Sequence, residues 1–274
     1  MKMLKKSLVL FFVFLGVNEL FALGTLELIN SQTLNINSAE NLIISYSSDN
    51  IVLLESNDSN LVLKEFMTRN RPEYFAKIEN SQNAITISSG KRPWLIRTRI
   101  EIYIPKIFND NLAVNLRSGN LKINSISSEN IVVDVSSGNI TIDELIGNNL
   151  TVRNGSGNIN INSFQGKVNT VNRSGNIMVN NFVGEGTFDV VSGNIDLTVN
   201  DIVGDLSLSS NRGNVNLFLG RNISFILDAE VGSGTINAPD LRSQVNTKVR
   251  HNIGSSPIYK VFAKCGSGNI NIIR

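Results

Sequence analysis

The chain has one cysteine, one histidine and one tryptophan in 274 residues. A lone cysteine, Cys265, cannot form an intramolecular disulfide, so the fold must be stabilised by a hydrophobic core. Cys265 follows Val-Phe-Ala-Lys, a setting that favours a buried, unreactive thiol. The lone histidine, His251, excludes a His-rich metal site or a Cys–His pair, and no Gly-x-Ser-x-Gly motif supports a Ser–His–Asp triad. The sequence therefore predicts no catalytic, cofactor or metal site.

Long apolar runs are absent beyond the N-terminus. The chain opens with the basic segment 1–6, continues with an eleven-residue apolar run at 7–17, and reaches the small residue Ala22 after a polar break. This order is typical of a secretory signal peptide, with cleavage expected after Ala22. The alternative is a membrane anchor, but eleven helical residues extend only about 16 Å against a hydrocarbon core of about 30 Å. We expect a periplasmic, cell-surface or secreted protein without a transmembrane segment.

An excess of one charge sign is also missing. The full chain carries 25 Lys and Arg against 23 Asp and Glu. The predicted leader removes Lys2, Lys5, Lys6 and Glu19, which leaves 22 residues of each sign. Because the mature chain is formally neutral, the pI near 8.7 gives no indication of nucleic acid or acidic lipid as a partner.

What the chain does contain is an internal repeat. The phrase Ser-Gly-Asn, usually followed by Ile, recurs with successive glycine intervals of 19, 19, 18, 18, 20, 21 and 34 residues. Such a period is typical of a stacked repeat protein. The glycines of the phrase and its weaker copies are Gly119, Gly138, Gly157, Gly175, Gly193, Gly213, Gly234 and Gly268.

Apolar residues hold fixed positions relative to each of these glycines. Positions +2 and +4 are apolar and position +3 is mostly polar, as in Ile159, Asn160 and Ile161. A second alternating segment precedes each glycine, so every unit is strand, turn, strand, turn. Identical offsets in every unit favour a parallel β-solenoid, an all-β fold with coils about 4.8 Å apart. The alternative is an antiparallel meander closed as a sandwich or barrel.

The Ser-Gly-Asn phrase itself marks a turn. Glycine adopts backbone angles that other residues avoid, and asparagine bonds its own backbone at turns. In a stack, equivalent asparagines also lie above one another and can form an amide ladder. We expect a structural role for these residues in preference to a binding role. The asparagines are Asn120, Asn139, Asn158, Asn176, Asn194, Asn214 and Asn269.

The regular phrase divides the mature chain. Residues 23–117 contain short apolar runs without it, and we expect irregular coils there. Residues 118–237 are expected to form the regular solenoid, and residues 238–274 contain an interruption, expected to be a hairpin or cap, before the last coil. Residues 23–274 are expected to form one continuous domain.

One alternating segment, 94–105, carries a basic and aromatic cluster: Lys91, Arg92, Trp94, Arg97 and Arg99. By parity, Trp94 shares the face of the isoleucines and points inward, while Arg97 and Arg99 point to solvent. A solvated strand face is therefore preferred to a binding patch.

The chain resembles the bacterial putative-adhesin family of β-strand-repeat domains of unknown function. The resemblance rests on the strand Arg-Ile-Glu-Ile-Tyr-Ile-Pro at 99–105, on the segment Leu112–Asn120 and on the serial Ser-Gly-Asn-Ile coils, and it covers about residues 35–274. It implies adhesion as the activity, an inference from architecture. That family has no defined catalytic or binding motif, so no functional residue is carried over.

Three function classes remain open on the sequence. The first is an exported, non-enzymatic adhesin or envelope binding module whose partner is a surface protein or glycan. The second is a polysaccharide lyase or hydrolase on a β-helix, and the third is an envelope structural protein without a ligand. The enzyme requires clustered carboxylates, for which the densest stretch is Asp189, Asp196, Asp201 and Asp205. Solvated turn positions are the preferred interpretation of these acids. The calcium-binding nonapeptide motif is absent.

Overall fold

The structure, a computed structural model, describes residues 25–220, 222–239 and 241–274, and the predicted leader lies outside them. The fold is all-β, and its strands pair in two rows. We call one the β10 row. From one end of the molecule to the other it contains β5 (Lys77–Asn80), β6 (Ala84–Ser88), β2 (Asn41–Ser48), β8 (Asn111–Ser118), β10 (Asn130–Ser137), the second halves of β11 (Ile140–Asn154), β12 (Ile159–Ser174), β13 (Ile177–Ser192) and β14 (Ile195–Arg212), then β20 (Tyr259–Ser267), β16 (Phe225–Ser233) and β19 (Lys248–Ile253).

The other row, called the β9 row, runs alongside the first. In the same order it contains β1 (Glu27–Leu34), β4 (Leu61–Met67), β7 (Thr98–Pro105), β3 (Asn50–Ser56), β9 (Leu121–Ser127), the first halves of β11 to β14, then β15 (Val215–Leu219), β21 (Ile270–Ile273), β17 (Thr235–Ala238) and β18 (Leu241–Val245). A single 3-10 turn, Pro72–Tyr74, is the helical element of the described residues.

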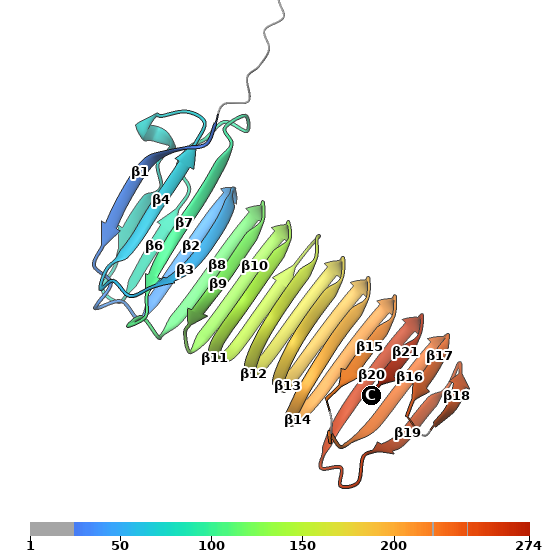
Figure 1. The fold of residues 1–274 in the computed structure, drawn as a ribbon. Helices are drawn as coiled ribbons and strands as arrows, with labels where there is room; N and C mark the ends of the chain where they lie inside the picture. Colours follow the sequence, from blue (N-terminus) through green and yellow to red (C-terminus); the bar gives the residue numbers. More distant parts are fainter. Residues whose placement is uncertain (1–24, 221, 240) are drawn as a thin grey trace, which may run out of the picture.

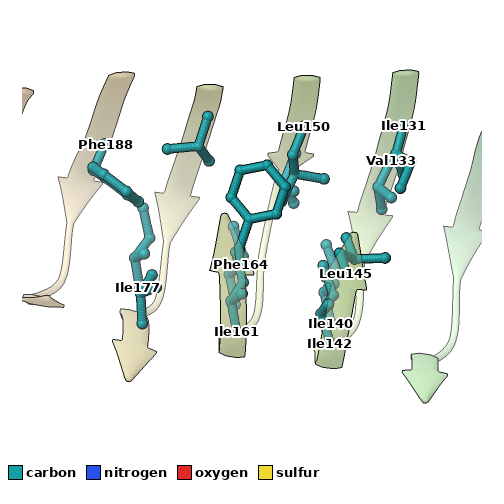
Figure 2. Close-up of a cluster of buried hydrophobic side chains, with 14 of the residues drawn as sticks. Ile131, Val133, Ile140, Ile142, Leu145, Leu150, Ile161, Phe164, Ile177 and Phe188 are labelled. Atoms are coloured by element: carbon teal, nitrogen blue, oxygen red, sulfur yellow. The ribbon is translucent and has the colours of Figure 1, made fainter. Parts of the chain in front are cut away.

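The core fills the space between the two rows. Residues at positions +2 and +4 of each unit, such as Ile159 and Ile161, are at most 1% exposed, whereas Asn160 between them is partly exposed. Strands of equivalent register pair in parallel, with Ile140 beside Ile159 and Ile159 beside Ile177. Figure 2 shows apolar side chains of successive coils meeting in this core. The fold is therefore the parallel β-solenoid that the repeat predicts, and the antiparallel sandwich is wrong.

The order of the coils differs from the order of the chain at both ends. The first coil, β2 and β3, lies between the β6–β7 coil and the β8–β9 coil. The last coil, β20 and β21, lies between β14–β15 and β16–β17. In Figure 1 the blue β2 accordingly lies beside the green β8, and the red β20 lies among orange strands. The sequence interval of 34 residues reflects this insertion.

Antiparallel strands close both ends of the stack. At the N-terminal end β1 and β4 continue the β9 row beyond β7, and β5 continues the β10 row beyond β6. At the other end β18 and β19 lie antiparallel to β17 and β16. These strands cover the terminal coils, whose unpaired edges would otherwise offer a template for pairing with another chain.

The expected inward position of Trp94 is wrong. The strand β7 begins only at Thr98, and Trp94 lies in the turn before it with 90% of its side chain exposed. Parity applies within a strand, so the alternation of Thr98, Ile100 and Ile102, all buried, does not extend back to residue 94. The tryptophan is therefore a surface residue at the N-terminal end.

Candidate functional site

The corners of the regular coils are built by the Ser-Gly-Asn phrase. At Gly157 the φ angle is +124°, and a Cβ there would overlap the backbone carbonyl of Gly138 in the preceding coil. Only glycine meets both conditions, since L-residues rarely adopt such angles and the coils stack too closely for a side chain. Positive φ angles of the same kind occur at Gly119, Gly138, Gly157, Gly175, Gly193, Gly213, Gly234 and Gly268.

The corner asparagines connect one coil to the next. The Oδ1 atom of Asn139 accepts a hydrogen bond from the backbone N–H of Asn158 at 2.9 Å, and Asn158 accepts in the same way from Asn176. The series continues through the inserted last coil, where Asn214 accepts from Asn269 at 2.8 Å. The rungs of this ladder are thus side-chain-to-backbone bonds. Because these contacts lie within the stack, we propose a structural role for the corner glycines and asparagines. The remaining donors in the series are Asn120, Asn139, Asn194, Asn214 and Thr235.

The four aspartates of the enzyme hypothesis do not come together. Asp189 lies in the β10 row and points outward, whereas Asp196 points outward from the β9 row, on the opposite face of the core. Asp205 accepts a hydrogen bond from the backbone N–H of Lys260, and Asp201 from that of Ile202. Partial burial raises the pKa of Asp189. Each acid thus has a separate environment, which does not support a two-carboxylate mechanism.

His251 and Cys265 are also far from any catalytic arrangement. His251 lies on the terminal strand β19 opposite Leu227, and its Nε2 atom has no hydrogen-bond partner among the described residues. Cys265 is 1% exposed and its Sγ lies 2.9 Å from the carbonyl oxygen of Gly213. Burial raises the pKa of the Cys265 thiol, although a backbone hydrogen bond with Ser267 partly opposes the rise. A thiol in this state is a poor nucleophile.

The outer surface of the β9 row carries lines of amide and carboxylate side chains, which we call the amide face. The Nδ2 of Asn162 donates to Asp143 at 3.1 Å, and that of Asn180 donates to Asn162 at 2.9 Å. A second line begins at Asp196, to which Asn216 donates at 2.6 Å. These bonds hold the side chains in fixed orientations along the stack. The full set is Asp143, Asn162, Asn180, Asp196, Asn216, Asn237 and Asn271.

A cavity of about 690 Å³ lies at the N-terminal end, and we call it the N-terminal pocket. Its polar lining comes from two segments, the corner after β2 and the loop before β7. Trp94 and Lys91 belong to this loop and are exposed, whereas Arg92 points into the fold with only 7% of its side chain exposed. The complete lining is Ser47, Ser48, Asp49, Ser89, Gly90, Lys91, Arg92, Pro93, Trp94 and Ile96.

Beneath this pocket, Arg92 meets two buried carboxylates. Its Nη2 donates to Glu65 at 2.8 Å, its Nη1 donates to Asp49, and its Nε donates to the carbonyl oxygen of Tyr74 at 2.6 Å. Glu65 also accepts from the backbone N–H of Ala76 at 2.9 Å. A buried charge is tolerated only when it is paired and hydrogen-bonded in this way. The carboxylates are therefore occupied by structural contacts, and the cluster joins β4, the 3-10 turn Pro72–Tyr74 and the two loops.

Tyr46 completes the surroundings of the cluster. The Arg92 guanidinium lies 5.6 Å from the centre of its ring, and the hydroxyl group is buried without a hydrogen-bond partner among the described residues. Burial raises the pKa of Tyr46 far above its usual value, and the neighbouring Glu65 carboxylate adds to the rise. Tyr46 therefore remains un-ionised, and its ring packs beside the Arg92 guanidinium.

The sequence carries a signal for Asp49 that lies outside the Ser-Gly-Asn series. Ser48, Asp49 and Asn50 pair with Ser118, Gly119 and Asn120, so Asp49 occupies the corner glycine position of the first coil. The flanking phrase is Ser-Asp-Asn-Ile, one residue different from the repeat. In the next coil outward, β6 and β7 are joined by the loop 89–97 instead of a tight corner, and this leaves room for the side chain of Asp49. Its carboxylate meets Arg92 and the hydroxyl of Thr98.

A second cavity of about 740 Å³ lies midway along the stack, at the turns opposite the Ser-Gly-Asn corners. Glu129, Glu144 and Gln165 contribute to its wall, and Ile146 is 59% exposed beside them.

Within the described ranges, no helix has the length and apolar character needed to cross a membrane. Among those same residues, no three His, Cys, Asp or Glu side chains gather where they would hold a metal ion.

A protein-family model matches most of the chain. The model of the family described as Toastrack DUF4097 matches residues 39–273. No curated protein matches the chain.

Several solved structures share the fold. A protein described as a putative adhesin, from Bacteroides fragilis NCTC 9343, is 15% identical, with a TM-score of 0.51 over 89% of this chain and 96% of that one. Another, from Parabacteroides distasonis ATCC 8503, is 15% identical, with a TM-score of 0.55 over 90% and 97%. A third, also from P. distasonis and described as a putative lipid binding protein, is 16% identical, with a TM-score of 0.52 over 88% and 96%. At these identities the likeness shows the fold.

Proposed function

The chain belongs to the Toastrack DUF4097 family, and from this premise we propose that it is an exported, non-enzymatic, adhesin-like binding protein of the cell envelope. Residues 1–22 are its cleaved leader, and residues 23–274 form one continuous domain. Its partner is a surface protein or a glycan. The names of two solved relatives, both described as putative adhesins, agree with this proposal.

The observation that carries the proposal is the amide face. Its side chains are fixed by mutual hydrogen bonds, as between Asn162 and Asn180, yet each amide and carboxylate retains further donor or acceptor capacity toward solvent. A rigid polar surface loses little conformational entropy on binding, which favours recognition of hydroxyl-rich or amide-rich partners. The separation of Asp189 from Asp196 and the pairing of Asp49 with Arg92 support a binding role in preference to hydrolysis.

Binding to a glycan panel and to extracted envelope proteins tests the proposal. A bulky charge on the amide face, Asn162→Arg with Asn180→Arg, is expected to abolish binding. The matched control, Thr187→Arg, lies on the outward face of the β10 row and is expected to leave binding intact. Turnover of any polysaccharide, or equal binding by both variants, would contradict the proposal.

Export is tested separately by the mass of the protein purified from the cell envelope. The expected mass is that of a chain whose first residue is Leu23, because the leader has a basic start, an apolar middle and a small residue at its end. An intact Met1, or retention of the protein in the cytoplasm, would refute the export part of the proposal.

A further inference from the structure

Two neighbouring loops lie at one edge of the N-terminal end, where β4 ends and β7 begins (Figure 1). They are residues 68–76 and 89–97, and we call them the cationic tip. The backbone N–H of Thr68 donates to the carbonyl oxygen of Arg97 at 3.3 Å, and the backbone N–H of Lys91 donates to the carbonyl oxygen of Glu73 at 3.0 Å. A small separate core of Met67, Tyr74 and Ile96 packs beneath them. The tip is therefore an ordered part of the fold.

The tip exposes two large apolar side chains next to each other. Trp94 is 90% exposed and Leu95 is 63% exposed, although the small core lies directly below them. Single exposed apolar residues are common, but an adjacent tryptophan and leucine on an ordered turn mark an interaction surface. Tryptophan in particular is favoured at the boundary between lipid and water, because its ring is apolar and its N–H is polar.

The two loops that hold this apolar pair at their surface also expose positive charge. Arg69, Arg71, Lys91 and Arg97 are all exposed, against the single carboxylate of Glu73 in these two loops. Glu73 pairs with Arg71 at 3.5 Å, whereas Arg69, Lys91 and Arg97 have no ion-pair partner in the described part of the chain. Arg92 does not contribute to this charge, because it is paired beneath the surface. Exposed cations thus outnumber carboxylates in these two loops.

The described chain also begins at this end. The strand β1 pairs Glu27 with Met67, beside the tip. If the protein is exported to the cell envelope, which rests on the proposed function, a bilayer surface is accessible to the tip.

We propose that the cationic tip docks on the anionic phospholipid surface of a bilayer, with Trp94 and Leu95 inserted among the headgroups. The exposed arginines and the lysine attract the anionic headgroups, and the apolar pair enters the interfacial layer. The solenoid then stands with its amide face free for a second partner.

The fluorescence of Trp94 tests the proposal directly, since it is the only tryptophan in the chain. The protein without residues 1–22, which contains every strand of the described fold, is mixed with vesicles of equimolar phosphatidylglycerol and phosphatidylcholine. We expect a blue shift of the emission, absent with pure phosphatidylcholine and reversed at about 0.5 M NaCl, where exposed charges are strongly screened.

Sedimentation with the same vesicles measures the contribution of each component. Trp94→Ala with Leu95→Ala, and separately Arg69→Glu with Lys91→Glu, are each expected to weaken binding by about tenfold or more. The matched control, Ile258→Ala with Lys260→Glu, changes an exposed apolar residue and an exposed cation near the opposite end and should bind like the parent. Thermal unfolding of each variant checks that the fold is retained.

Three results would overturn the proposal. They are an unshifted Trp94 emission on anionic vesicles, equal binding to pure phosphatidylcholine, and sedimentation that the tip variants do not weaken. An equal blue shift with soluble heparin would identify an acidic glycan as the partner and would also overturn it. The vesicle test involves neither the leader nor the amide face, so its failure would leave the proposed function standing, and loss of glycan binding would leave the tip proposal standing.

Discussion

Asp49 and Arg92 lie 43 positions apart, and their ion pair depends on a single departure from the repeat. The corner of the first coil has aspartate where the regular coils have glycine, and the described residues with positive φ other than glycine are only Asn222 and Asn246. Asp49 therefore forms its corner without the left-handed backbone. The side chain so gained cross-links the loop before β7 to the first coil. This single substitution in the repeat thus gives the N-terminal end an ion pair that the regular corners lack, and we call it the Asp49 anchor.

Removal of Arg92 should show the strength of this anchor. Arg92→Ala leaves the carboxylates of Asp49 and Glu65 buried without their cation, which typically costs about 3–5 kcal/mol of unfolding free energy. The matched control is Arg153→Ala, because Arg153 pairs with Asp134 at 3.3 Å on the exposed surface. It should cost less than about 1 kcal/mol. Denaturant unfolding measures both, and equal effects would mean that the cluster does not stabilise the fold.

Neighbouring residues on one strand of the central coil should also differ. Ile161→Ala leaves a cavity between the coils of β11 and β13, and such a change typically costs about 2–5 kcal/mol. Asn160 faces outward and is partly exposed, so Asn160→Ala should stay within about 0.5 kcal/mol. Urea unfolding followed by circular dichroism compares the two, and small effects at both sites would contradict the buried face.

At the scale of the element, the unit of this fold is the coil, and its spacing is set at the corners. The glycine carbonyl of one coil lies where the side chain of the next corner would extend, as at Gly138 and Gly157. The asparagine Oδ1 then accepts a backbone N–H of the following coil, as in the bond from Asn176 to Asn158. The corner glycine, which has no side chain, lets the coils approach closely, and the amide of the next residue, asparagine, bonds them together. These two residues therefore hold the strands in register.

A methyl group at the corner tests this account. Gly157→Ala requires a strained φ angle and drives a Cβ into the carbonyl of Gly138, so a loss of more than about 1 kcal/mol is expected. Gly220 provides the control, because a Cβ there comes no closer than 3.2 Å to any neighbour and its φ is not in the left-handed region. Gly220→Ala should cost clearly less than Gly157→Ala, because a shift of a few tenths of an ångström relieves the contact at Gly220. Differential scanning calorimetry of the two variants decides the matter, and equal melting temperatures would show that corner geometry is unimportant.

At the scale of the whole molecule, the first and last full coils in sequence do not form the ends of the stack. The last coil pairs on both sides, with β14 and β15 on one side and with β16 and β17 on the other. In the folded molecule this coil therefore fills a slot between coils that precede it in sequence. The corresponding arrangement at the N-terminal end places β2 and β3 inside the β6–β7 coil.

Truncation after residue 254 should open this slot. The shortened chain exposes strand edges in both rows, and we expect lower thermal stability together with aggregation. A synthetic peptide of residues 255–274 should restore a folded complex, because it contains β20 and β21. A peptide with Val261→Asp and Ile270→Asp is the control, since both side chains are fully buried. An undiminished melting temperature of the truncated chain, or equal rescue by both peptides, would contradict this topology.

The sequence by itself determined the coil, its strands, its buried positions and the parallel solenoid. These features depend on residues close together in the chain, and the pattern of Ile159, Asn160 and Ile161 is repeated often enough to indicate them. The tertiary structure alone decided the order of the terminal coils, because every coil offers nearly the same backbone edge. It also decided the surface position of Trp94, the contact of Asp49 with Arg92, and the position of exposed cations from two separate loops at one tip. Each of these depends on contacts between segments far apart in sequence, which no local period encodes.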